Sequence, residues 1–336
     1  MKNILYIGNQ LSQKDKTETT IDTLGALLQS EGYNVSKTST KKNKALRLLD
    51  MLLHVIKHRK SVDYVLIDTY STTNFYYAYF CGRLCHYFKL KYIPILHGGS
   101  LPNRLRRSPK LSRQLFDNAL TNVAPSQYLM SSFNAEGFYN ITHIPNSIAL
   151  EKYQFNKRFI TDIRLLWVRS FSNIYNPKLA IQILKALKED HLSASLCMIG
   201  PDNDGSLKET RAFAKKMNVE VEFTGKLSKA EWHKKSEAFN VFINTTTIDN
   251  TPVSVIEAMA LGLPVISTNV GGLSYLIQNE NDGVLVESNN TDAFKNAIIK
   301  LKTDATLLSK IVTNARDKAE AFDWEVIKQH WFSVLS

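Results

Sequence analysis

The chain has 336 residues, a formal net charge of +11 and hydrophobic residues at 44% of its positions. This length suggests about two domains of ordinary size, each large enough for a full hydrophobic core. The N-terminus, MKNILYIGNQ, has too short an apolar run for a signal peptide, and no stretch approaches the roughly 18 apolar residues of a membrane span. Cys81, Cys85 and Cys197 fit neither a disulfide framework nor a zinc site. We therefore expect reduced core thiols in a cytoplasmic protein.

The positive charge is confined to the first half of the chain. Residues 1–158 contain 22 Lys and Arg against 10 Asp and Glu, whereas residues 159–336 contain 20 against 21. Such asymmetry indicates an anionic partner of the first half, such as a membrane surface, a phosphate-bearing acceptor or nucleic acid. No nucleic-acid-binding module or basic–aromatic interleaving is present, so we expect no nucleic acid. Peripheral association with the inner face of the membrane stays open.

The first half alternates strand and helix patterns, which predicts a parallel sheet with helices on both faces. Gly8 ends the first strand, but no second glycine follows at the spacing of a dinucleotide fingerprint, so an NAD site is not expected. The predicted strands span 4–8, 33–39, 63–68, 92–96, 121–124 and 141–150, and the predicted helices span 17–31, 44–60, 74–90 and 127–133, the last capped by Ser126.

Two basic segments of this half each allow two interpretations. Helix 44–60 has leucines on most faces and basic residues at its ends, so it either lies in a membrane interface or covers the sheet, and the second is favoured by its apolar arc. The second segment follows the fourth predicted strand and contains Arg104, Arg106, Arg107, Lys110 and Arg113. It either forms a solvated face or meets an anionic acceptor or lipid headgroup.

After a linker at 151–159, the second half repeats the alternation. Its predicted strands span 163–170, 194–200, 221–225, 240–244, 265–267 and 284–287, with helices over 177–189, 206–217, 228–239, 252–261, 291–302 and 304–321. The chain therefore divides into a domain over 1–155 and a domain over 156–321. The amphipathic helix 322–336 has aromatic residues suited to packing back on the first domain.

Residues 243–272 contain the chain's most informative motif. A polar loop, 244–250, follows one strand, and a helix then begins with Thr251 as its cap and Pro252 as its first residue. Parallel sheets bind ligands beyond the carboxyl ends of their strands, and free amides at a helix N-terminus suit a phosphate. Asp249 lies in the loop, where it reaches a ligand over the helix start, whereas Glu257 points sideways and can accept hydrogen bonds from a diol such as a ribose.

This stretch resembles the donor site of retaining glycosyltransferases of family 4, with two acids separated by seven residues and followed by AMALGLPVIST and VGG. The resemblance implies a GT-B fold, in which two Rossmann-like, doubly wound parallel sheets enclose a crevice between the domains. It further implies transfer from a nucleotide-diphosphate sugar with retention, without a metal or other cofactor. The acceptor would be a glycan or a lipid-linked intermediate of cell-surface polysaccharide biosynthesis.

The resemblance also assigns site residues. His97, at the end of the fourth strand, looks like the family's histidine against the donor sugar, and Arg169 matches the arginine of its Gly-Arg element. With Asp249, these form the expected catalytic set. The expected donor-binding set is Gly98, Gly99, Arg169, Gly225, Lys226, Asn250, Thr251, Val253, Ser254 and Glu257.

Two departures from the family pattern leave alternatives open. The first acid is usually Glu, where this chain has Asp249, and Tyr175 stands where a Lys is common. A catalytically silent sugar-nucleotide-binding partner is therefore the main alternative, and a sugar-nucleotide epimerase of the same fold is another. Asp202 and Asp204 form a D-x-D, a pattern of metal-dependent glycosyltransferases of another fold, but PDNDG is ordinary turn chemistry, so we interpret it as a turn.

Overall fold

A computed structural model of the protein describes residues 1–10 and 19–336. These residues form two compact units: unit 1 consists of Met1–Pro145 and His330–Ser336, and unit 2 of Asn146–Gln329. The first boundary lies earlier than the predicted 155, because Ile148 and Tyr153 are buried in the core of unit 2. The predicted start of the first helix, at residues 17 and 18, lies outside the described residues.

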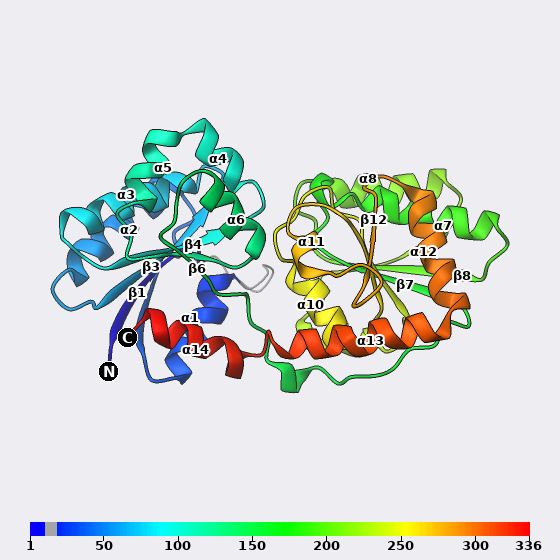
Figure 1. The fold of residues 1–336 in the computed structure, drawn as a ribbon. Helices are drawn as coiled ribbons and strands as arrows, with labels where there is room; N and C mark the ends of the chain where they lie inside the picture. The colour runs from blue at the N-terminus through cyan, green and yellow to red at the C-terminus, as the bar shows by residue number, and fades with distance from the viewer. Residues whose placement is uncertain (11–18) are drawn as a thin grey trace. The chain divides into compact units, whose positions relative to one another are not determined.

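Unit 1 is built on a six-stranded sheet in the order β2-β1-β3-β4-β5-β6, with every neighbouring pair parallel (Figure 1). Its strands are β1 (Asn3–Ile7), β2 (Asn34–Thr38), β3 (Tyr64–Tyr70), β4 (Tyr92–His97), β5 (Asn122–Ala124) and β6 (Ile141–His143). Its helices are α1 (Thr20–Ser30), α2 (Lys44–His58), α3 (Phe75–Tyr87), α4 (Leu101–Arg107), α5 (Pro109–Phe116) and α6 (Gln127–Ala135). Ser126 caps α6 as predicted, with its Oγ accepting the Leu129 N–H.

The helices α2, α3 and α5 pack side by side on one face of this sheet, and α1 lies on the other (Figure 1). The sequence did not predict α4 and α5, which bury Leu101, Leu105, Leu115 and Phe116 in the core of unit 1. The helix α14 (Trp324–Val334) begins in unit 2 and ends in unit 1. There the Phe332 ring lies 6.2 Å from the Tyr33 ring, so the C-terminus completes unit 1.

Unit 2 repeats the architecture with a second parallel sheet in the order β12-β11-β10-β7-β8-β9. Its strands are β7 (Ile163–Val168), β8 (Ala194–Ile199), β9 (Glu222–Gly225), β10 (Val241–Asn244), β11 (Val265–Thr268) and β12 (Val284–Val286). Its helices are η1 (Leu150–Lys152), η2 (Asn173–Tyr175), α7 (Pro177–Glu189), α8 (Ser206–Lys216), α9 (Lys229–Ser236), α10 (Val253–Ala260), α11 (Leu273–Leu276), α12 (Thr291–Thr303) and α13 (Ala305–Glu320).

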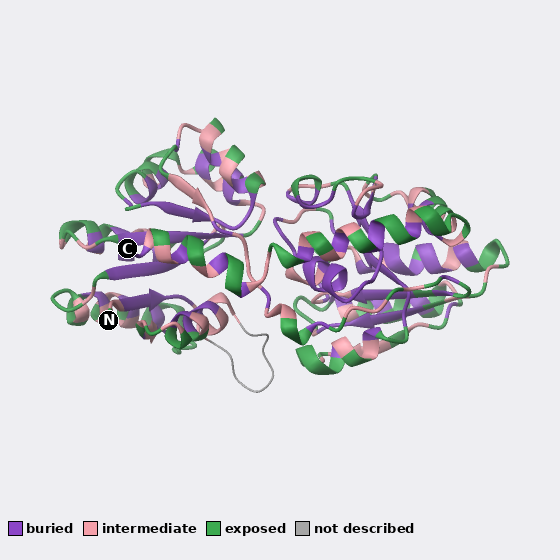
Figure 2. Ribbon diagram, turned by 60° about the horizontal axis from the view of Figure 1, so that its bottom comes forward, coloured by how far each residue is buried: buried purple, intermediate pink, exposed green. Residues whose placement is uncertain are grey.

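Two apolar layers cover the two faces of this sheet. One core packs α7 and α12 against the strands, and the other packs α10 and α13. Figure 2 shows the result, because buried residues follow the strands and the inner faces of the helices while exposed residues follow the outer faces. Within the described ranges, no helix is both long enough and apolar enough to cross a bilayer.

Each sheet reverses its strand order at one point, which positions the candidate sites. In unit 1 the chain moves from β1 outwards to β2 and then returns to β3 on the other side of β1. In unit 2 it moves from β7 to β8 and β9 and then returns to β10. Ligands bind to such sheets beyond the carboxyl ends of the strands at these reversals. The candidate sites therefore lie beyond the carboxyl ends of β1 and β3 in unit 1 and of β7 and β10 in unit 2.

Candidate functional site

The reversal in unit 2 brings together the loop after β10, the start of α10 and the loop after β11. The helix begins at Val253 with Pro252 as its N-cap, one residue later than predicted, because Pro252 has an extended backbone with ψ 117°. The loops meet closely. The Gly272 N–H donates to Asp249 O at 3.0 Å, and a Cβ added at Gly272 would lie 1.9 Å from Asn250 O. The VGG motif therefore lets the two loops touch.

Arg169 follows β7 directly and reaches this same edge. Its Nη2 donates to Asp249 Oδ2 in a short ion pair, and both side chains are largely buried, at 15% and 13% exposed. The Tyr175 ring lies beneath the guanidinium, with 3.9 Å between Arg169 Cζ and the ring centroid. Tyr175 therefore positions Arg169 by a cation–π contact where the family commonly supplies a second cation. Arg169 and Asp249, both assigned to the expected catalytic set, are thus in direct contact.

Glu257 lies in the second turn of α10 and is 5% exposed. Its Oε1 accepts the Tyr153 hydroxyl at 2.7 Å and Lys229 Nζ at 2.9 Å. No residue of the described ranges donates to its Oε2, so this oxygen is the one available to a ligand hydroxyl. Burial and the Glu257 charge hold the pKa of Tyr153 well above its ordinary range, so the phenol stays a donor.

The remaining predicted donor-binding residues of unit 2 lie at the start of α10 and at the end of β9. Asn250 and Thr251 are buried before α10, and Val253 and Ser254 open the helix, where the first N–H groups have no intrahelical acceptor. The Ser254 Oγ is buried without a hydrogen-bond partner among the described residues. Gly225 ends β9 and accepts the Gly200 N–H at 2.9 Å, and Lys226 follows it.

Asp202 and Asp204 act as turn residues, in agreement with our interpretation of the D-x-D. Asp202 Oδ1 accepts the Gly205 N–H at 2.9 Å, and Asp204 Oδ2 accepts the Ser172 hydroxyl at 2.8 Å. Hydrogen bonds from Ser206 and Ser172 lower the pKa of Asp204 to about 2. Both carboxylates are thus used to fix the start of α8.

In unit 1, His97 is the last residue of β4 and is 9% exposed. Its Nε2 lies 2.8 Å from Asp68 Oδ1, and its ring stacks on Tyr70 with 4.8 Å between centroids. Because a carboxylate can only accept, Nε2 carries the hydrogen of this bond. Gly98 follows with a φ of +82°, and Gly99 O accepts the Tyr128 hydroxyl at 3.4 Å.

Asp68 is the centre of this cluster, at the reversal between β1 and β3. The Tyr6 hydroxyl donates to its Oδ1 at 3.0 Å, and burial together with Asp68 raises the pKa of Tyr6 well above its ordinary range. Its other oxygen, Oδ2, is buried and has no partner in the described part of the chain. A Cβ at Gly8 would lie 2.4 Å from this oxygen, so only glycine leaves room for it.

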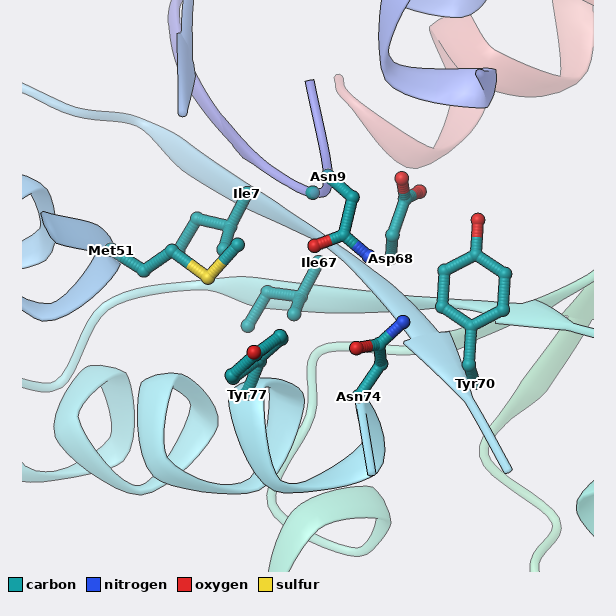
Figure 3. A pocket seen from close by; sticks show the side chains of 9 residues that line it. Ile7, Asn9, Met51, Ile67, Asp68, Tyr70, Asn74 and Tyr77 are labelled. Atoms are coloured by element: carbon teal, nitrogen blue, oxygen red, sulfur yellow. The ribbon is translucent and has the colours of Figure 1, made fainter. Parts of the chain in front are cut away.

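A pocket opens beside Asp68 (Figure 3). Asp68 and Tyr70 extend from the same strand to the same side, and Asn9 lies beside the Asp68 carboxylate. The full lining is Ile7, Gly8, Asn9, Met51, Ile67, Asp68, Tyr70, Asn74 and Tyr77. The pocket therefore combines hydroxyl, amide and carboxylate groups with an apolar floor in a space about the size of one water molecule.

Sequence reasoning missed Asp68, Tyr70, Tyr153 and Lys229. Asp68 lies inside a predicted strand, where its side chain had no assigned role, and Tyr153 lies in the predicted linker. Lys229 pairs with a residue 28 positions away, and no local pattern reports such a contact. For Asp68, a signal was present, since a charged residue in an otherwise apolar buried strand requires a partner.

The five basic residues at 104–113 are partly used within unit 1. Arg104 donates to Ser71 O from Nε at 2.9 Å, and Arg113 lies over the Phe138 ring at 4.6 Å. Arg106 pairs with Glu136 at 3.8 Å. These three contacts favour a structural role for much of this segment. Within the described ranges, no group of three or more His, Cys, Asp or Glu side chains is arranged to hold a metal ion.

Comparisons with known proteins agree with this architecture. The family model for glycosyl transferases group 1 matches residues 151–318. The α-1,3-galactosyltransferase of Escherichia coli that acts from UDP-Gal on α-D-GlcNAc-diphosphoundecaprenol is 37% identical over 82 residues, which are 24% of this chain and 21% of that protein. A D-inositol 3-phosphate glycosyltransferase of Rhodococcus erythropolis is 40% identical over 70 residues, covering 21% of this chain and 16% of that protein. The matches thus span about a fifth of these relatives.

Solved structures extend the likeness to the whole fold. Sucrose-phosphate synthase of Thermosynechococcus elongatus superimposes with a TM-score of 0.83 at 15% identity, covering 99% of this chain and 98% of that one. HepE of Anabaena, solved in complex with UDP, gives 0.77 at 17% identity, covering 100% and 99%. The fold is therefore GT-B, as predicted. Since the family model covers half of the sequence and coincides with the unit that contains Arg169, Asp249 and Glu257, the chain belongs to the glycosyl transferases group 1 family.

Proposed function

We propose that the protein is a retaining glycosyltransferase that moves a sugar from a nucleotide-diphosphate sugar to an acceptor hydroxyl. One observation carries this proposal: Arg169, Asp249 and the first turn of α10 meet at the strand reversal of unit 2, with the buried Glu257 in the next turn. A cation and free helix amides suit a diphosphate, and a buried carboxylate suits a diol. HepE structures with UDP and with UDP-glucose support a sugar nucleotide as the donor.

The proposed roles follow from this chemistry. Arg169 and the N–H groups of Thr251, Val253 and Ser254 stabilise the leaving diphosphate. Glu257 holds the ribose through Oε2, and Asp249 contacts the transferred sugar. By family resemblance, His97 with the backbone at Gly98 and Gly99 also acts on that sugar, and Gly225 and Lys226 flank the base. The acceptor oxygen forms a bond to the anomeric carbon while the bond between that carbon and the diphosphate oxygen breaks. The departing phosphate oxygen takes the proton of the acceptor hydroxyl. Retention rests on the family resemblance.

We further propose that no metal is needed, because Arg169 and the helix N-terminus already supply positive charge for the leaving group. Transfer in buffer with excess chelator should equal transfer with added magnesium or manganese. Abolition by chelator, with recovery on adding manganese, would contradict this expectation.

For the acceptor, we propose a glycan or a lipid-linked intermediate of cell-surface polysaccharide assembly. The likeness to a galactosyltransferase acting on a diphosphoundecaprenol-linked sugar supports a lipid-linked acceptor. The basic first half supports a peripheral position on the inner face of the membrane, since cytoplasmic leaflets are anionic.

A pair of substitutions tests the two acids. Glu257→Gln keeps an acceptor for the Tyr153 hydroxyl but removes the charge, and loss of charge-assisted hydrogen bonds worth about 1.5–3 kcal/mol should weaken nucleoside-diphosphate binding roughly ten- to a hundredfold. Asp249→Asn keeps an oxygen that can accept from Arg169, so it should leave that affinity within a few-fold, but it should abolish most turnover because we assign the Asp249 carboxylate to the transferred sugar. Titration calorimetry with UDP and GDP measures the nucleotide affinity. Release of sugar from UDP-sugars and GDP-sugars measures the turnover.

Glu209→Gln is the matched control, since Glu209 is an exposed acid of the same unit. Equal nucleotide binding by all variants would remove the role assigned to Glu257. Normal nucleotide binding by the wild type without transfer or hydrolysis would favour the alternative, a catalytically silent sugar-nucleotide-binding partner. Conversion of the donor without an acceptor would favour an epimerase.

A further inference from the structure

Helix α2 exposes a stripe of large apolar residues. Leu46, Leu49, Leu53 and Ile56 are 57%, 53%, 53% and 38% exposed, and their spacing of three, four and three residues aligns them along one side of the helix. The opposite side, with Met51 and Val55, is buried in the core of unit 1. The helix therefore covers the sheet, as the favoured interpretation predicted, and also presents a second apolar face that unit 1 does not bury.

Helix α3 adds a parallel aromatic stripe. Tyr76, Phe80 and Tyr87 are 41%, 45% and 77% exposed and repeat at helical spacing. The two helices run side by side: the Tyr77 hydroxyl donates to Lys44 O at one end, and Arg59 lies over the Phe88 ring at 5.6 Å at the other. Both pack their inner faces on the same sheet, so both stripes face away from it. Seven of the fourteen exposed large hydrophobic residues in the described chain lie on these two helices, and apolar residues gathered in this way are typical of an interaction site.

Basic residues stand at both ends of this surface. Lys41, Lys42 and Lys44 precede or begin α2, and Lys57, Arg59 and Lys60 end it, all of them exposed. Asp50 is the only acid between residues 41 and 60, and its carboxylate accepts the Thr38 hydroxyl at 3.0 Å. An apolar face with lysines at its margins matches an anionic bilayer, whose headgroups pair with the cations while its interior receives the apolar side chains.

We propose that the exposed faces of α2 and α3 dock the protein on an anionic lipid bilayer, with the Leu46–Ile56 stripe and the Tyr76–Tyr87 stripe entering the interface. The positive charge of this surface favours an anionic bilayer over a second copy of the chain as its binding partner. A symmetric dimer through this face would bring two sets of lysines together, whereas an anionic lipid surface neutralises them.

The position of this surface gives it a role in the proposed reaction. This role rests on the proposed function, in which the acceptor is lipid-linked. Met51 of α2 and Tyr77 of α3 line the pocket beside Asp68 with their inner faces. Arg47, in the first turn of α2, donates to Asn9 Oδ1 at 3.1 Å at the same edge of the sheet. Docking through α2 and α3 therefore brings the bilayer to the edge of unit 1 where the polar pocket opens.

Sedimentation with vesicles tests the proposal on the full chain. The wild type should bind vesicles of phosphatidylcholine and phosphatidylglycerol at least tenfold more strongly than vesicles of phosphatidylcholine alone, and higher salt should weaken this binding. The triple variant Leu46→Gln, Leu49→Gln, Leu53→Gln should lose about tenfold in partitioning. The control Leu120→Gln removes an exposed leucine of unit 1 outside the surface and should change nothing.

A second pair of variants tests the charges. Lys57→Gln with Lys60→Gln should reduce binding several-fold and flatten its salt dependence, whereas Lys208→Gln with Lys216→Gln, an equal charge change on α8 of unit 2, should not. Unaltered thermal unfolding of each variant shows that its fold is kept, as expected for exposed positions.

Binding of the leucine variant at the wild-type level would overturn the proposal, as would equal binding to neutral and anionic vesicles. Concentration-dependent dimers that the leucine substitutions abolish, without vesicle binding, would instead assign the surface to a second copy. A separate measurement of nucleotide binding distinguishes failure of the docking proposal from failure of the proposed enzymatic function. A protein that binds vesicles but no sugar nucleotide keeps the docking surface and loses the proposed enzymatic function.

Discussion

At the residue scale, the departures from the family pattern have a physical explanation in unit 2. A tyrosine cannot replace the charge of a lysine, but the Tyr175 ring lies 3.9 Å beneath Arg169 and restricts the guanidinium to one face. The Tyr175 carbonyl also accepts the Thr245 hydroxyl at 2.8 Å, which fixes the backbone that carries the ring. The shorter Asp249 then meets Arg169 directly. Tyr175 and Asp249 therefore hold Arg169 in one position at this strand reversal.

Asp68→Asn tests whether Asp68 positions His97. The amide keeps the size of the side chain but can donate to Nε2, which would reverse the hydrogen bond and move the ring proton to Nδ1. We expect turnover to fall about ten- to a hundredfold, in line with the loss of a hydrogen bond to a charged group. Nucleotide affinity, which we assign to unit 2, should stay within a few-fold. Separate measurement of kcat and of the nucleotide dissociation constant distinguishes these effects.

Asp63→Asn provides the control for this prediction, because Asp63 precedes the same strand at its other end and is exposed. A merely structural role for Asp68 would lower stability and leave the pH profile of kcat unchanged. Retention of full turnover, with the wild-type pH profile, would contradict the positioning role.

The candidate site could be predicted from sequence only where its residues lie close together in the chain. Asp249, Thr251, Ser254 and Glu257 fall within one loop and one helix, so the motif contains their arrangement. Tyr153, by contrast, meets Glu257 across 104 positions. A single sequence carries no local signal for such a contact, because the three-dimensional path of the chain creates it.

At the element scale, the strands were predictable because buried parallel strands are continuous apolar runs. Helix α7 was also predicted with its observed bounds, since Pro177 marks its start. Helices α4 and α5 were missed because arginines and lysines dominate 101–116 and Pro109 interrupts it. Their buried positions, such as Leu101 and Leu105, keep helical spacing, but the segment is too short for this pattern to stand out.

Gly272→Ala tests the contact between the loops after β10 and β11. A Cβ would lie 1.9 Å from Asn250 O, which is backbone and cannot rotate away, so the loops must separate. We expect a loss of about 1–3 kcal/mol in the free energy of unfolding, as for other overpacked sites. Nucleotide affinity should fall as well, because Asp249 and the start of α10 move with the loop. Urea unfolding and nucleotide titration measure the two effects.

Ser274→Ala is the comparison for this substitution, since it alters the same segment without adding an atom at the contact. Its Oγ donates only to Gly271 O at 3.2 Å on the exposed side. Unchanged nucleotide binding in Gly272→Ala, at a reduced stability, would separate the loop contact from the ligand site.

At the scale of the whole molecule, the two units share one architecture but carry different side chains at the carboxyl ends of their strands. Each is a six-stranded parallel sheet with one reversal of strand order. The edge of unit 2 carries a cation, free helix amides and Glu257, whereas the edge of unit 1 carries Asp68, Tyr70 and His97 around a pocket. The same topology therefore places a cation and a helix N-terminus at the strand reversal of one unit and a buried carboxylate cluster at that of the other.

Histidines in both units make stability dependent on pH. Burial lowers the pKa of His58 and His143 in unit 1 and of His233 in unit 2, where the attraction of Glu257 opposes the effect. A histidine whose folded pKa is lowered disfavours protonation of the native state. Its contribution to stability is therefore complete above the ordinary pKa of about 6.5 and is lost as pH falls below it.

We therefore expect the free energy of unfolding to decrease between about pH 7 and pH 5, in a range where most carboxylates are still ionised. His233→Gln should reduce the slope of this decrease for unit 2, because the neutral amide cannot take up the proton that the unfolded histidine binds. His191→Asn is the control, since His191 is exposed and asparagine tolerates its φ of +58°. Urea unfolding followed by tryptophan fluorescence at several pH values gives the slopes. A wild-type stability that rises on acidification, or an unchanged slope in His233→Gln, would show that burial does not oppose protonation of His233.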